Sequence, residues 1–132
     1  MAVDALATTW APRVLSILRF MAGLMLLDHG TGKILKFPFV QRWANIDLSS
    51  MSGIAGYLEL VGGALLVVGL FTRPVAFILS GMCAVAYFFA HAKTSFHPVL
   101  NNGEAAALYA FVLLYIAAAG GGPWSVDAMR NK

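Results

Sequence analysis

Residues 54–71 of the chain read IAGYLELVGGALLVVGLF, and this stretch decides the fold. Its 18 residues include one charged side chain, Glu59. As a helix that rises about 1.5 Å per residue, the stretch nearly spans a bilayer core of about 30 Å. Gly56 and Gly63 fall on the same helical face as Glu59. A glutamate facing lipid costs roughly a few kcal/mol, so we expect this face to turn inward and meet a neighbouring helix closely.

The composition indicates an integral membrane protein. Of the 132 residues, 60% are hydrophobic and 11% are charged. A soluble domain usually carries about a quarter charged residues. We therefore predict an all-α fold, a transmembrane four-helix bundle with both termini on the same side. One domain, residues 1–132, would hold four spans, at about residues 14–35, 54–71, 74–91 and 103–120.

Charge and cysteine content restrict the partners and the chemistry. The net charge of +3 is too dilute for nucleic acid but suits loops beside anionic headgroups, so we expect the lipid bilayer as partner and no nucleic acid. A slight excess of basic residues favours cytoplasmic termini in a bacterial inner membrane. The single cysteine, Cys83, excludes an internal disulfide and is most simply a small buried hydrophobe.

The first expected span has a face of small and basic residues. Arg19, Gly30 and Lys33 share this face, which predicts a packing seam against other spans. We expect Arg19 to pin the end of the bundle opposite Lys33 by pairing with backbone carbonyls or headgroups. Gly30 and Gly32 weaken a helix, so its last turn and a half should be irregular. Pro12 is placed to begin this helix.

Ionisable groups from all four spans are expected at one membrane level. Spans that alternate in direction bring the end of the first and third to the same side as the start of the second and fourth. The groups that this topology gathers are His29, Lys33, Glu59, His91 and Glu104.

Such a cluster predicts proton handling. A His–Glu pair near neutrality can take up and pass on protons, so Glu59, His29 and His91 are the catalytic candidates. Tyr87 and Tyr115 offer hydroxyl groups. The candidate binding residues are Lys33, Tyr87, Asn102, Glu104 and Arg19. The site suits a polar head group such as a quinone carbonyl, with an apolar tail toward lipid; it would equally suit proton-coupled transport.

Metal and haem sites are not expected. His29, Glu59, His91 and Glu104 offer four ligand groups, but no tight spacing such as H-x-x-E-H joins them, so we predict no metal. Nothing marks the two histidines as an axial pair for haem. The cofactor stays unknown, with a quinone as the candidate, and whether the chain is an enzyme stays open. Glu104 also has a structural explanation, because an acid in the first turn favours the helix dipole.

The chain resembles the DoxX family of small four-helix membrane proteins from Arg19 to Asp127. The resemblance includes Arg19 with Gly30 and Lys33, Glu59 with the glycines after it, and the exit GLFTRPVA. Its most specific part is HPVLNNGEAAALYAFVLLYIAAAGGGPWSVD. The residues that match the family's polar pattern are Arg19, Lys33, Glu59, Asn102 and Glu104.

The resemblance implies a role beside quinone-linked redox enzymes. The family's name comes from a subunit linked to thiosulfate:quinone oxidoreductase and terminal quinol oxidase activity, and other relatives are associated with thiol-stress complexes. Our first hypothesis is an accessory or quinone-interacting subunit of a membrane redox system, with a redox partner subunit. The second is a small-molecule or proton-coupled transporter that works as a homo-oligomer. The third is a non-catalytic assembly or stabilising subunit.

Overall fold

The computed structural model describes residues 1–131, which form helices and loops without a strand. The all-α prediction is thus confirmed. The long helices are α1 (Ala2–Gly30), α2 (Met51–Val68), α3 (Thr72–Ala86) and α5 (Glu104–Ala119). The short helical segments are η1 (Thr31–Leu35), η2 (Gln41–Trp43), η3 (Tyr87–His91), α4 (Pro98–Asn101) and α6 (Val126–Arg130).

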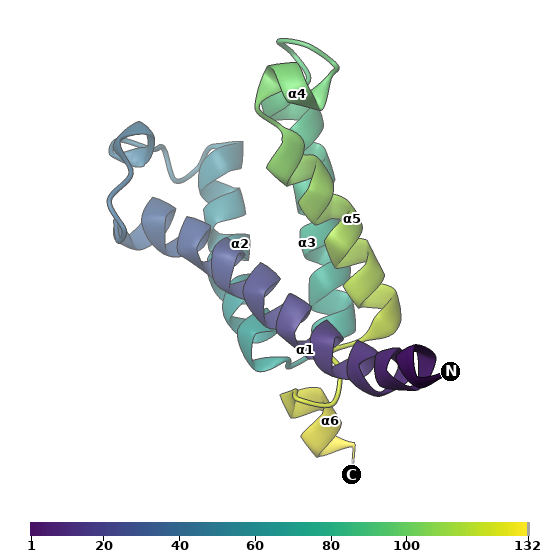
Figure 1. The fold of residues 1–132 in the computed structure, drawn as a ribbon. Helices are drawn as coiled ribbons and strands as arrows, with labels where there is room; N and C mark the ends of the chain where they lie inside the picture. Colours follow the sequence, from purple (N-terminus) through teal and green to yellow (C-terminus); the bar gives the residue numbers. More distant parts are fainter. Residues whose placement is uncertain (132) are drawn as a thin grey trace.

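The long helices form two pairs. α1 packs along α2 and α3 along α5, and the pairs come together where residues 69–71 join α2 to α3 (Figure 1). We call this the terminal end, because both chain termini lie toward it (Figure 1). The pairs spread apart toward the loop end, which holds η1, η3 and the loops of residues 36–50 and 92–97 (Figure 1). We call the pair of α1 and α2 the first arm and the pair of α3 and α5 the second arm. Ionisable residues at the loop end are therefore divided between the two arms.

Three of the long helices are compatible with a membrane by length and composition. They are α1 with η1 (Ala2–Leu35), α2, and α3 with η3 (Thr72–His91). α5 is apolar but has 16 residues, which rise about 24 Å and fall short of a bilayer core of about 30 Å. Large apolar side chains such as Phe77 and Phe111 are exposed, as expected of surfaces in contact with lipid. The fourth span and the membrane side of the termini stay predictions.

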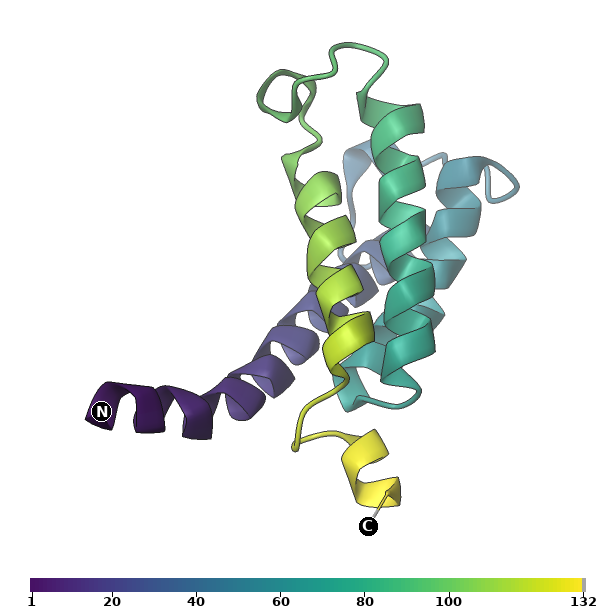
Figure 2. The ribbon, with the colours of Figure 1, turned by 90° about the vertical axis from the view of Figure 1, so that its right-hand side faces the viewer.

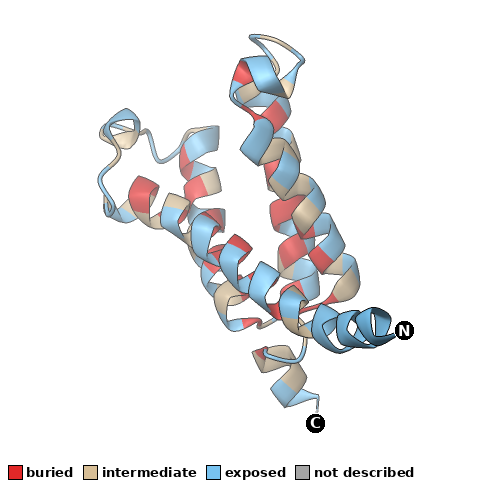
Figure 3. Cartoon of the chain, in the orientation of Figure 1, coloured by how far each residue is buried: buried red, intermediate tan, exposed pale blue. Residues whose placement is uncertain are grey.

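The start of the first helix differs from expectation, because Pro12 lies inside α1 instead of beginning it. Proline removes one hydrogen bond from a helix interior and bends it without always ending it. Figure 2 shows α1 bent in its first half, and Figure 3 shows that this N-terminal part is exposed. Residues 2–11 include four alanines, the residue with the highest helix propensity.

The second helix begins and ends earlier than the expected span of residues 54–71. The Ser50 hydroxyl caps α2 by accepting a hydrogen bond from the Gly53 amide at 3.2 Å. Gly69 ends the helix in the left-handed region, at φ 76°. These two caps, and not the limits of the apolar run, set the bounds of α2.

Two helices end in π-helical turns at the loop end. The predicted irregularity of the first helix is confirmed, since Thr31–Leu35 form the π-helical η1. The third helix ends the same way in η3, Tyr87–His91, where no glycine gave a signal. An extra residue in a turn shifts the facing of the side chains that follow, and such turns are frequent at functional sites.

Glycines allow α1 and α2 to approach closely. A Cβ added at Gly63 would lie 2.6 Å from the Leu27 backbone nitrogen, and one at Gly30 would lie 2.4 Å from the Leu60 nitrogen. The predicted packing seam on the first helix is therefore the contact with α2. The core between the two pairs is small, and its members from the four long helices are Ala22, Leu26, Leu66, Ala76, Leu79, Cys83, Leu113 and Ile116.

Candidate functional site

A buried ion pair joins η1 to α2. Lys33 Nζ donates to Glu59 Oε1 at 2.8 Å, and the two residues are 8% and 4% exposed. Gly56, one turn before Glu59, leaves room for the lysine stem: a Cβ added there would lie 3.1 Å from Lys33 Cβ. Removing one partner would strand a buried charge, which is strongly destabilising. The two residues therefore act as a unit.

Trp43 of the first loop covers the lysine. Lys33 Nζ lies 5.3 Å from the centroid of the indole ring, and the ring edge fills the space beside Gly32. Lys36 Nζ holds the loop in place by donating to the carbonyls of Trp43, at 2.6 Å, and Lys33, at 3.1 Å. The pair is thus shielded on the side of the loop.

His29 does not reach Glu59. Its Nδ1 lies 3.0 Å from the Met25 carbonyl oxygen, and its ring packs on Trp43 with centroids 5.5 Å apart. No hydrogen bond or ion pair links it to Glu59 within residues 1–131. The expected His–Glu contact is therefore absent on this arm, because a similar depth along two helices does not make two side chains face each other.

A second polar cluster lies on the other arm, around Asn101. The Asn101 amide donates to Tyr87 Oη at 3.1 Å and to the Ser95 carbonyl at 2.7 Å. Tyr87 donates to the Phe96 carbonyl, and His91 Nδ1 lies 3.1 Å from the Asn101 carbonyl oxygen. This cluster fixes the loop between η3 and α5. It gives Tyr87 and His91 structural contacts away from Glu59.

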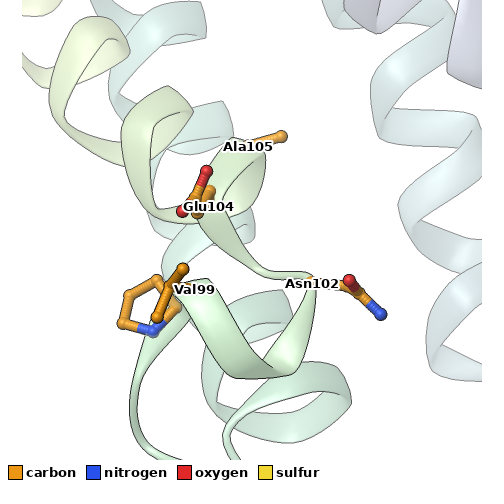
Figure 4. A pocket seen from close by; sticks show the side chains of 5 residues that line it. Val99, Asn102, Glu104 and Ala105 are labelled. Carbon is orange, nitrogen blue, oxygen red and sulfur yellow. The ribbon is translucent and has the colours of Figure 1, made fainter.

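Asn102 and Glu104 lie outside both clusters. Asn102 has a φ of 59° and is exposed, as is Glu104. With Pro98, Val99 and Ala105 they line an open hollow, and Figure 4 shows their polar groups pointing to different sides of it. The buried asparagine is Asn101, which the sequence analysis missed. Asn101 and Asn102 are consecutive, and nothing in the sequence indicates which of the two is buried.

Arg19 is buried at the terminal end, away from Lys33. It is 3% exposed, and its guanidinium donates to the carbonyls of Leu66 at 2.9 Å, Trp124 at 3.0 Å, and Gly121. The expected pairing with backbone carbonyls is therefore found. Leu66 is in the last turns of α2, where the carbonyls carry the negative end of the helix dipole. Arg19 ties the C-terminal segment to α1 and α2.

The ion pair faces the second arm across Cys83. Leu79 of α3 packs against Gly62 of α2, where an added Cβ would lie 2.9 Å from a Leu79 methyl group. Because the chain reverses between α2 and α3, Glu59 and Cys83 come opposite each other one turn nearer the loop end. Tyr109 of α5 packs against the hydrophobic core cluster that contains Cys83.

Tyr109 is a further polar group that the sequence analysis missed. Its hydroxyl oxygen is shielded from solvent and has no hydrogen-bond partner among the described residues. Tyr115, which was expected to offer a hydroxyl, is 60% exposed on the outer side of the same helix. Tyr109 stands in the apolar run ALYAFVLL, where periodicity alone does not set one tyrosine apart.

Comparison with known proteins identifies the family. The DoxX family model matches residues 14–92, which is more than half of the chain. The chain belongs to the DoxX family. A protein of Haemophilus influenzae, described as an uncharacterized protein, is 41% identical to this DoxX chain over 122 residues, covering 89% of this chain and 91% of that protein. No solved structure matches the chain.

Some of the candidate residues lie inside the region that the DoxX family model matches, and others lie outside it. It includes Arg19, Lys33, Glu59 and His91 and ends before α5. The ion pair thus lies inside the matched region, whereas Tyr109 lies beyond it. The family resemblance noted from the sequence is confirmed, and the chemistry of the DoxX chain has to be argued from its own residues.

Proposed function

We propose that this DoxX chain is an accessory, quinone-interacting subunit of a membrane redox system, and that Lys33 and Glu59 hold the polar head of the quinone. The observation that carries the proposal is the buried 2.8 Å ion pair between helices apolar enough to span a membrane. Ionisable residues at such positions are costly and usually serve substrate, ion or proton pathways.

The pair offers the hydrogen bonds that a quinone needs. A lysine ammonium has three N–H donors, and Glu59 Oε1 accepts one of them. Another can point to a quinone carbonyl oxygen, which only accepts hydrogen bonds. Reduction of a quinone to a quinol takes up two electrons and two protons. The electrons would come from the redox partner subunit, and the role of this chain is to bind the head group and to hold a proton beside it.

Binding of decylubiquinone to the purified protein in nanodiscs tests the proposal. We expect the dissociation constant of Glu59→Gln to rise about tenfold, since the variant weakens the hold on Lys33. The double variant Lys33→Met with Glu59→Leu removes both charges together, which spares the fold the cost of a lone buried charge, and should abolish binding. Lys93→Met, at an exposed lysine of the loop end, is the matched control. Equal affinity in all four proteins, or no binding by the wild type, contradicts the proposal.

A second candidate, a non-catalytic assembly subunit, is favoured by the close packing around the pair. Gly56 and Trp43 both fit against Lys33, so the pair could serve only to fix the register of η1 on α2. In that case Glu59→Gln lowers the melting temperature and leaves quinone binding and the activity of a co-purified redox partner unchanged. Quinone binding and partner activity of Glu59→Gln therefore distinguish the two candidate functions.

A further inference from the structure

Tyr109 brings a hydroxyl from the second arm toward the ion pair. Ser80 Oγ of α3 donates to the Ala110 carbonyl at 2.6 Å, which sets the level of Tyr109 on α5 relative to α3. Long side chains on a helix point back toward its N-terminus. The N-terminus of α5 is at the loop end, so we expect the phenol to extend toward the level of Cys83 and Glu59. The packing of Tyr109 against the core cluster that contains Cys83 agrees with this placement.

The hydroxyl has no partner of its own. It is shielded from solvent and makes no hydrogen bond to the described residues. An unpaired buried hydroxyl costs roughly 1–3 kcal/mol, which is why such groups usually have a partner. Phenylalanine would fill the same space without this cost. The hydroxyl is therefore best explained by a molecule that it meets in the bound state.

We propose that Tyr109 is the third polar group of the Lys33–Glu59 site and donates a hydrogen bond to an acceptor oxygen of the bound molecule. This inference rests on the proposed function and makes it more specific. Lys33 and Tyr109 are both donors, contributed by different arms, so the matching ligand presents carbonyl oxygens. A quinone head has two such oxygens and no donor. A bound quinone would thus connect the two arms. His29 and His91 do not connect them, because each histidine has its hydrogen-bond contact within its own arm.

The test compares two tyrosines on α5. Tyr109→Phe removes the hydroxyl and keeps the ring, and Tyr115→Phe makes the same change at an exposed position. With decylubiquinone in nanodiscs we expect about tenfold weaker binding for Tyr109→Phe and no change for Tyr115→Phe. Without ligand, the melting temperature of Tyr109→Phe should equal or exceed that of the wild type, because the hydroxyl it loses has no partner.

Each contrary result has its own meaning. Wild-type affinity in Tyr109→Phe, together with weakened binding in Glu59→Gln, overturns the role of Tyr109 and leaves the proposed function standing. A melting temperature several degrees lower for ligand-free Tyr109→Phe shows that the hydroxyl has a structural partner, which also overturns it. Absence of binding by the wild-type protein overturns the proposed function and this inference with it.

Discussion

Two buried basic residues of α1 and η1 have different partners and therefore different roles. The Arg19 guanidinium is satisfied by carbonyl oxygens of Leu66, Gly121 and Trp124, a neutral set that leaves its positive charge in place. The Lys33 ammonium meets the carboxylate of Glu59, so the charges cancel locally. Arginine suits the first position because its planar fork reaches several acceptors at once. Lysine suits the second because its ammonium has three N–H donors, of which Glu59 Oε1 accepts one.

Asp127 makes stability at the terminal end depend on pH. Its carboxylate accepts from the backbone amides of Phe71 at 2.9 Å and Thr72 at 2.8 Å. Burial acts to raise the pKa of Asp127, but the bonds from Thr72 and Phe71 and the charge of Arg130 outweigh it and hold the pKa below its usual value. The stabilising contribution is therefore present above the unfolded-state pKa of about 3.9 and is lost as pH falls through the lower folded-state value.

We predict that Asp127→Asn lowers the melting temperature at pH 7 by a few degrees, roughly the effect of one charge-assisted hydrogen bond. The difference from the wild type should shrink as pH falls below about 4. Thermal unfolding in detergent, followed by tryptophan fluorescence between pH 3 and 7, measures it. Asp28→Asn, at an exposed position of α1, is the control. A gap between Asp127→Asn and the wild type that stays constant over this range contradicts the role of the carboxylate.

At the scale of elements, the contact between α1 and α2 depends on the absence of side chains. A Cβ at Gly63 would lie 2.6 Å from the backbone of Leu27, which cannot move aside as a flexible side chain can. Gly81 of α3 has no atom within 4 Å of the same position. The two glycines thus offer the same substitution in a tight and an open environment.

We predict that Gly63→Ala destabilises the protein by about 1–3 kcal/mol, because the helices must separate to admit the methyl group. Gly81→Ala should be neutral or stabilise by up to about 1 kcal/mol, since alanine is the better helix former. Unfolding of both variants in mixed micelles gives the comparison. Equal melting temperatures for the two would show that the seam is not the close contact described.

Hydropathy and side-chain type predicted most of the helices but not all of their ends or contacts. Apolar runs predicted the long helices, and Gly30 with Gly32 predicted the irregular end of the first helix. The π-helical η3 carried no such signal, because Tyr87 and His91 gain their partners from Asn101 and the second loop. Helical periodicity also shows which face is polar without showing which helix it meets. The structure brings Lys33 and Glu59 together, whereas His29 and His91 have other partners, and the functional roles predicted for all four residues stay predictions.

At the scale of the whole molecule, the two helix pairs are held together at one end and separate at the other. Arg19 and Asp127 both bind the segments that close the terminal end, and the small core lies between the pairs. Lys33 lies in η1 at the loop end, and Glu59 lies in the first half of α2. The two arms diverge toward the loop end (Figure 1). The quinone proposal for this DoxX chain places the head group at this ion pair. A proton-coupled transporter would instead be recognised by uptake into proteoliposomes that follows an imposed pH gradient.

Photolabelling with an azidoquinone in native membranes, followed by peptide mapping, tests the central claim most directly. We predict labelled peptides that contain Lys33, Glu59 or Tyr109, and loss of this label when excess decylubiquinone competes. Label confined to lipid-exposed positions such as Phe77 and Phe111, or label that decylubiquinone does not reduce, would contradict a quinone site at the ion pair.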